Sequence, residues 1–144
     1  YPLGRKLARE NAQRARRLQD YGSIITVVAT DAPLLPHQLV RLSKRAALGI
    51  GRTGSVAAHG SGEIIVAFST ANTLPRVITS PIRELGMLQD RYIDPLYRSV
   101  IDATEEAILN ALVAADPMTG RDGHHIEAVP HDWIRRIAKE SHFK

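Results

Sequence analysis

Residues 22–30 read GSIITVVAT, and this stretch decides the fold. Six of the eight residues from Ser23 to Thr30 are β-branched, a composition that favours a strand. A nearly continuous apolar run of this length is typical of a strand that is covered on both faces. Residues 63–70, which read EIIVAFST, have the same character and predict a second buried strand.

The residues between these two strands predict a helix followed by a loop. Apolar residues recur at helical spacing from Leu39 to Ile50, which predicts a helix over residues 36–48. Five glycines fall within residues 49–62. They predict a loop region, with room for a short strand at its centre.

The second half of the chain predicts two more helices. Residues 73–93 contain two prolines and a glycine and are expected to be irregular. Asp94-Pro95 is typical of a helix start and opens a long helix that ends before Pro117. A turn follows, and Pro130 opens a last, short helix. The order strand, helix, strand, long helix, short helix predicts an α/β or α+β fold.

Composition excludes several classes of protein. The chain has 144 residues, of which 44% are hydrophobic and 24% charged, as expected for one globular domain. No apolar stretch approaches the roughly 20 residues of a membrane span, so no membrane partner is expected. There is no cysteine, which excludes disulfide scaffolds, thiolate zinc sites and cysteine nucleophiles.

The excess positive charge lies at the start of the chain. Residues 1–22, the basic leader, hold six basic and two acidic residues, whereas residues 23–144 are neutral overall. A nucleic-acid binder would use such a leader as a phosphate-binding arm. The leader has no aromatic residue among its basic ones and the rest of the chain adds no basic stripe. We therefore interpret it as a solvated helix or linker and expect no nucleic-acid partner.

Residues 49–54 read GIGRTG and match the dinucleotide-binding pattern G-x-G-x-x-G. That motif requires a strand before it and a helix that opens from it. Here a predicted helix precedes and a predicted strand follows, so no helix N-terminus faces a pyrophosphate. We interpret the glycines as a connection that lets the backbone approach a neighbouring strand or a substrate closely.

Four potential metal ligands lie within eight residues: His124, His125, Glu127 and His131. The segment lacks two histidines at H-x-x-x-H spacing on a helix, and Gly123 makes it irregular. We interpret these side chains as belonging to a surface loop, and we expect neither a metal nor a cofactor.

The pair Gly22-Ser23 directly before a buried strand suits an N-terminal nucleophile. In such hydrolases a precursor is cut before a Ser, Thr or Cys, and the freed residue uses its own hydroxyl as nucleophile and its own α-amine as base. A free α-amine has a pKa of about 7.7–8, much closer to neutrality than that of lysine. The pattern is also that of an ordinary Gly-Ser pair before a strand, and spacing alone leaves both readings open.

A resemblance to a known family adds weight to the first reading. Residues 23–34, which read SIITVVATDAPL, resemble the start of the β-subunit of the P1-family (S58) peptidases, and the similarity continues through residues 41–55. It continues again through SGE at residues 61–63 and AFSTAN at residues 67–72. This family includes the L-aminopeptidase/D-amidase-esterases and the β-peptidyl aminopeptidases.

The resemblance implies a fold, an activity and a site. The fold would be a four-layer αββα sandwich of the N-terminal nucleophile hydrolase type. Ser23 would be the nucleophile that autocleavage after Gly22 releases, and Ser61 and Glu63 would be further catalytic residues. The substrates would be small peptides, amides or esters, from which the N-terminal residue is removed. The partners would be the α-subunit of the same precursor and further αβ units of a homo-oligomer.

The residues themselves agree with this assignment of Ser61 and Glu63. They are two positions apart at the start of a predicted strand, so both side chains point to one face. A carboxylate there could hold the α-amine of Ser23 or a substrate's amino group, and a hydroxyl could relay a proton. The alternative is a serine in a turn and an edge carboxylate in solvent.

The chain departs from the family in its length, because family members are more than twice as long and most of the α-subunit precedes the cut. We expect residues 1–22 to be the C-terminal end of the α-subunit and residues 23–144 to be the β-subunit-like segment. The oxyanion-stabilising side chain is expected outside this sequence, and one face of the sheet would be uncovered. The alternative function is a truncated, non-catalytic β-subunit-like fragment or assembly module.

The basic leader provides a first test. We predict that the chain has no sub-micromolar affinity for DNA or RNA at about physiological salt, because its charge is confined to one short segment. Filter binding over a salt series measures this affinity. Tight binding that falls steeply with salt would instead identify the leader as a phosphate-binding arm.

Overall fold

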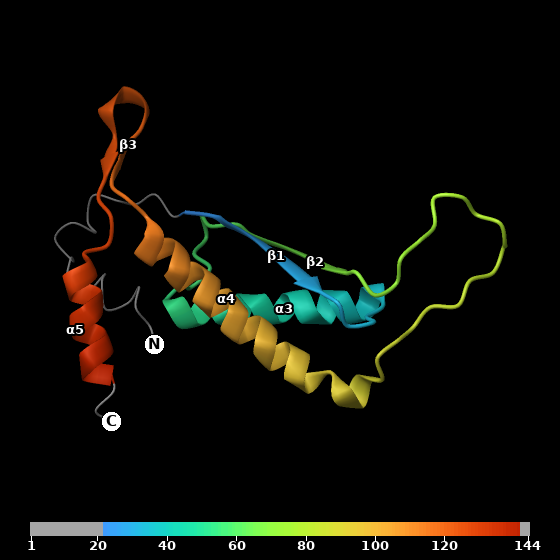
Figure 1. Ribbon diagram of the computed structural model, residues 1–144. Coiled ribbons are helices and arrows are strands. Elements are labelled where there is room, and N and C mark those ends of the chain that lie inside the picture. Colours follow the sequence, from blue (N-terminus) through green and yellow to red (C-terminus); the bar gives the residue numbers. More distant parts are fainter. Residues whose placement is uncertain (1–21, 142–144) are drawn as a thin grey trace. The chain divides into compact units, whose positions relative to one another are not determined.

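In a computed structural model of the chain, residues 22–141 are described; the rest of the basic leader lies outside this range. Strand β1 (Ile24–Thr30) leads through helix α3 (Pro36–Thr53) to strand β2 (Glu63–Ser69). The two strands pair in parallel, with Ile24 opposite Glu63, and they lie side by side with α3 along one face (Figure 1). α3 is therefore the crossover that a parallel pair requires.

Two compact units divide the chain between Glu105 and Glu106, within helix α4. The elements after β2 are η1 (Asp90–Tyr92), α4 (Asp94–Ala114), β3 (Met118–Thr119), η2 (Arg121–Gly123), β4 (His125–Ile126) and α5 (His131–Ser141). The strands β3 and β4 form a short antiparallel hairpin where the sequence predicts a turn, and α5 is the predicted last helix. Within residues 22–141, no helix has both the length and the apolar character needed to cross a bilayer.

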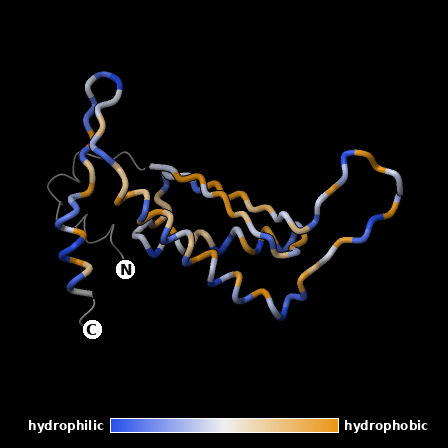
Figure 2. The backbone as a smooth tube through the Cα atoms, viewed as in Figure 1, coloured by the Kyte–Doolittle hydropathy of each residue, from blue (hydrophilic) through white to orange (hydrophobic). Residues whose placement is uncertain are grey.

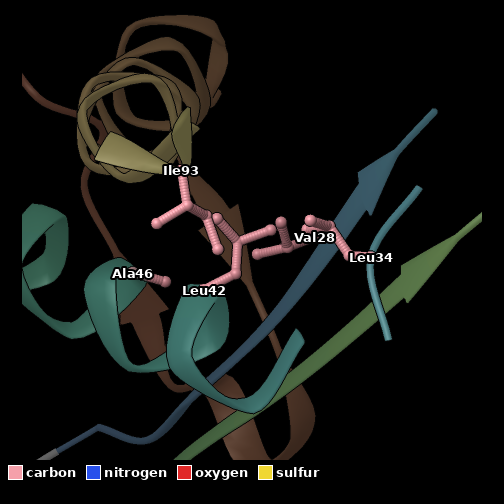
Figure 3. Close-up of a cluster of buried hydrophobic side chains, with 5 residues drawn as sticks. All are labelled: Val28, Leu34, Leu42, Ala46 and Ile93. Atoms are coloured by element: carbon pink, nitrogen blue, oxygen red, sulfur yellow. The ribbon is translucent and has the colours of Figure 1, made fainter. Parts of the chain in front are cut away.

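The core of the first unit lies between α3, β1 and the start of α4. Val28, Leu34, Leu42, Ala46 and Ile93 are buried and form one cluster (Figure 3). Leu42 and Ala46 lie on one face of α3, as the helical spacing of apolar residues predicts. Each large aliphatic side chain buried in this way stabilises the fold by about 1.5–3 kcal/mol.

The opposite face of the two strands is not covered by the described residues. Ile25 and Val27 in β1 are 71% and 64% exposed, and Ile64, Val66 and Phe68 in β2 are exposed as well. These five side chains form what we call the open face, and both strands appear as apolar tracks in Figure 2. Within residues 22–141, burial on both faces is therefore not observed, whereas the uncovered face expected from the chain's length is present.

α3 is longer than the sequence predicts, because the helix continues through Thr53 instead of ending at residue 48. Within residues 49–62 there is no strand, which corrects the expectation of one at the centre of this stretch. Gly54 ends the helix with φ of 119°, a left-handed conformation that glycine adopts without strain, and its N–H donates to the Gly51 carbonyl at 3.1 Å. The GIGRTG motif therefore forms the C-terminal end of α3 and not a loop, and no helix opens from it, so the rejection of a dinucleotide-binding motif is unchanged.

A close contact with α4 accounts for the glycine at position 49 of this helix. A Cβ atom at Gly49 would lie 2.6 Å from the Ile101 carbonyl oxygen and 2.8 Å from the Cβ atom of Thr104. The expected close approach is therefore real, but its partner is α4 and not a strand or a substrate. Arg52, one turn later, pairs with Asp102 and Glu105 and joins the same two helices.

The buried side-chain amide of Gln38 binds the end of the long connection between β2 and η1 to α3. Gln38, fully buried in α3, donates from Nε2 to the Leu88 carbonyl at 2.7 Å and to Asp90 Oδ1 at 2.8 Å. Arg41 also donates to Asp90. The hydrogen bonds from Arg41 and Gln38 lower the pKa of the Asp90 carboxyl. Residues 73–89 otherwise extend away from the strands as the predicted irregular segment (Figure 1).

The contact at Gly49 yields a prediction with a matched control in the same helix. Gly49→Ala should lower the melting temperature, because its methyl group forces α3 and α4 apart. Gly51→Ala has no atom within 4 Å of its added Cβ and should stabilise the helix by about 0.5–1 kcal/mol. Thermal unfolding of both variants measures the difference. A Gly49→Ala variant as stable as Gly51→Ala would show that the helices do not need this approach.

Candidate active site

The parallel register of β1 and β2 brings two distant segments together at the start of the sheet. The Ile24 N–H donates to the Gly62 carbonyl at 3.0 Å and begins the strand pairing. The residues just before each strand therefore adjoin, although 39 positions separate them in the sequence. Gly22 and Ser23 directly precede β1, and Ser61 and Gly62 directly precede β2.

Ser61 lies at the centre of this group. Its Oγ atom lies 2.7 Å from the carbonyl oxygen of Gly22, to which the hydroxyl donates. The same Oγ atom lies 3.0 Å from Glu63 Oε1. Ser61 thus connects the predicted carboxylate with the carbonyl group of the Gly22–Ser23 peptide bond.

The Ser23 hydroxyl is held by the backbone of the neighbouring strand. Its Oγ atom accepts a hydrogen bond from the Gly62 N–H at 3.1 Å. A Cβ atom at Gly62 would lie 3.7 Å from this Oγ, an ordinary contact. Ser23 and Gly22 are exposed, whereas Ser61 and Glu63 are half-buried. The structure therefore brings together the four residues that the sequence singles out.

Glu63 lies on the face of the sheet that α3 covers. It shares the strand parity of Ile65 and Ala67, which pack against the buried cluster. As expected from their spacing, Ser61 and Glu63 point to one side and contact each other. Within residues 22–141, Glu63 forms no ion pair. Its carboxylate contacts the hydroxyl of Ser61.

The turn before β2 positions Ser61. The Ser61 N–H donates to the Ala58 carbonyl at 2.8 Å, and the Ala57 N–H donates to Ser55 Oγ at 3.2 Å. Ala57 has φ of 47°, a left-handed conformation that is uncommon for a residue other than glycine. Backbone strain of this kind persists where the surroundings enforce it, often beside functional sites.

Sequence reasoning missed one group in this site, the N–H of Gly62. Backbone groups leave no signal in residue type. A parallel pairing of the two predicted strands from their first residues onward would have placed Gly62 beside Ser23.

The histidine segment has a different arrangement. His125 lies in β4, where its ring contacts Thr119 at 2.8 Å and Glu127 at 3.4 Å. His131 begins α5 and its Nε2 atom lies 2.9 Å from the Val113 carbonyl oxygen. In the part of the chain that the structure describes, no three potential ligands lie close enough to hold a metal ion.

Comparisons with known proteins identify the family of the chain. A family profile described as peptidase family S58 matches residues 1–126. The beta-peptidyl aminopeptidase BapA of Sphingosinicella microcystinivorans is 48% identical over 119 residues, which cover 83% of this chain and 30% of that protein. BapA of Sphingosinicella xenopeptidilytica is 44% identical over 128 residues, which cover 87% of this chain and 31% of that protein.

A solved structure supports the fold. The L-aminopeptidase D-Ala-esterase/amidase of Ochrobactrum anthropi, described as a prototype of the serine aminopeptidases and a variant of the Ntn hydrolase fold, matches with a TM-score of 0.74 and 40% identity. The match covers 80% of this chain and 32% of that one. The fold type implied by the resemblance is therefore confirmed. The chain spans about a third of the length of the relatives it matches.

Proposed function

The chain belongs to peptidase family S58, and on this premise we propose that it is the nucleophile-bearing part of a serine aminopeptidase that matures by cutting itself between Gly22 and Ser23. One observation carries the proposal. The Ser61 hydroxyl donates to the carbonyl oxygen of the bond to be cut, and the Ser23 hydroxyl lies on the other side of the same peptide unit, held by Gly62.

In the proposed self-cleavage, Ser23 Oγ attacks the carbonyl carbon of Gly22. The Oγ–C bond forms, the C–N bond breaks, and the hydroxyl proton ends on the Ser23 nitrogen. Water then hydrolyses the resulting ester, which leaves a carboxylate on Gly22 and a free hydroxyl and α-amine on Ser23. The hydrogen bond from Ser61 stabilises the negative charge that develops on the Gly22 oxygen.

In the mature enzyme the same groups would act on a substrate. The α-amine of Ser23 is the base for its own hydroxyl. The Gly62 N–H, which holds Ser23 Oγ before the cut, is placed to donate to the oxyanion of an acylated Ser23. The Glu63 carboxylate holds an ammonium group, either that of Ser23 or that of the substrate.

The proposed substrates are peptides, amides or esters with a free amino terminus, because the relatives are beta-peptidyl aminopeptidases and an aminopeptidase/amidase. The proposed partners are the α-subunit part of the same precursor and further αβ units. In this proposal, residues 1–22 end the α-subunit and residues 23–144 form the β-subunit. The non-catalytic alternative is not favoured, because the peptidase family profile and the aminopeptidase relatives match most of this chain.

The nucleophile is tested by removing its hydroxyl. Ser23→Ala in the full-length protein should remain a single uncut chain without peptidase activity, because no other hydroxyl takes the place of Oγ. Intact-mass spectrometry detects the cut, and circular dichroism checks that the variant folds. Ser99→Ala, on the exposed surface of α4, also removes a serine hydroxyl, is the matched control and should process normally. Cleavage of Ser23→Ala at this bond would end the proposal of self-cleavage.

The carboxylate is tested by removing its charge. Removing one partner of a desolvated charge contact costs on the order of 2–5 kcal/mol, so Glu63→Gln should lower kcat/KM for a dipeptide by at least about thirtyfold. The melting temperature should change little, because a half-buried residue at a strand start adds little to the core. Near-normal kcat/KM would remove Glu63 from the site, and a collapsed melting temperature would make its role structural.

A further inference from the structure

The hydroxyl of Ser61 faces two acceptors but carries one proton. Its Oγ atom lies 2.7 Å from the Gly22 carbonyl oxygen and 3.0 Å from Glu63 Oε1. A carbonyl oxygen only accepts, and an ionised carboxylate only accepts as well. Each contact is a full two-centre hydrogen bond at the same time only if Glu63 carries a proton and donates it to Ser61, while Ser61 donates to Gly22.

The charge of Glu63 therefore decides which way the Ser61 proton points. An ionised carboxylate attracts that proton, because hydrogen bonds to charged acceptors are the stronger ones, and the Gly22 carbonyl loses its donor. A protonated carboxyl acts as a donor and turns the Ser61 proton toward Gly22. Glu63 then donates to Ser61 and Ser61 donates to the Gly22 carbonyl, which is the group that self-cleavage must polarise.

We propose that protonation of Glu63 switches self-cleavage on, while the ionised form of the same residue serves peptide hydrolysis after the cut. This inference rests on the proposed function, since it concerns the regulation of the same site. Before the cut the group opposite Ser61 is a neutral carbonyl. After the cut a free α-ammonium group is present at Ser23, and a charged Glu63 is then the favourable partner.

Among the described residues, the neighbouring elements bring no charged partner to Glu63. β1 contains no ionisable side chain from Ile24 to Thr30. On α3, which packs against β2, Arg41 pairs with Asp90, Arg45 stacks on Tyr97 and Arg52 pairs with Asp102 and Glu105. The other ionisable groups of α3 and the following turn are His37, Lys44 and His59. Among the described residues, none of these forms an ion pair with Glu63.

The test measures self-cleavage and peptidase activity against pH in the full-length protein. Precursor from a short cell-free synthesis is transferred into buffers between about pH 5 and pH 8, and intact mass gives the cleavage rate. Cleavage of the wild type should slow as the pH is raised across this range, because fewer molecules then carry a proton on Glu63. The kcat/KM of the mature enzyme should instead fall as Glu63 becomes protonated.

Two substitutions of Glu63 separate the effect of its proton on self-cleavage from the effect of its side chain. In Glu63→Gln, the amide donates to Ser61 at every pH, so cleavage at neutral pH should be faster than in the wild type and independent of pH. Glu63→Ala can neither donate nor accept and should cleave slowly across the whole range. Ser61→Ala, which lacks the donor to Gly22, should do the same.

Two results would overturn the inference: wild-type cleavage that is flat or rises with pH, or a Glu63→Gln variant that cuts no faster than Glu63→Ala. Failure of the proposed function looks different, because Ser23→Ala would then be cut like the wild type. Circular dichroism of each variant on the time scale of the assay separates slow cleavage from slow folding.

Discussion

The register between β1 and β2 is the constraint on which the site depends. Opposing Ile24 to Glu63 places the first residues of both strands at the same edge, and the hydrogen bonds from Ser61 to Gly22 and from Gly62 to Ser23 cross between the strands at this point. A slip of one residue would turn the side chains of a strand to the other face. The buried cluster disfavours a one-residue slip of β1, because Val28 would then turn away from α3. Packing about five residues away therefore sets the hydrogen bonds around Ser23.

Much of this arrangement could be read from the sequence, and for identifiable reasons. The β-branched runs gave both strands nearly to the residue, and the two-residue spacing placed Ser61 and Glu63 on one side. The end of α3 could not be read, because local composition assigns glycines to loops and Gly49 is explained by a contact with α4, 52 or more positions further on. The N–H of Gly62 was missed because it belongs to the backbone.

The open face lies on the side of β1 and β2 opposite the buried cluster. Ile25, Val27, Ile64, Val66 and Phe68 project from two strands that α3 covers on the opposite side. In a four-layer αββα sandwich, the two sheets pack their inner faces together at about 10 Å. The described residues thus contribute a helical layer and part of one sheet, and the exposed apolar side chains mark the surface on which the second sheet of such a fold packs.

The separation of 39 positions between the two halves of the site has a consequence for the order of events in a newly made chain. Non-local contacts form late, because the intervening chain must first be ordered. Here that means α3 must close the crossover before Ser61 meets Gly22. In the proposed self-cleavage, a chain with the wrong register would keep an intact peptide bond and have no reactive amine. The proposed cut would then be a permanent record that a molecule has completed its folding, and a reactive amino terminus would be withheld from molecules that have not.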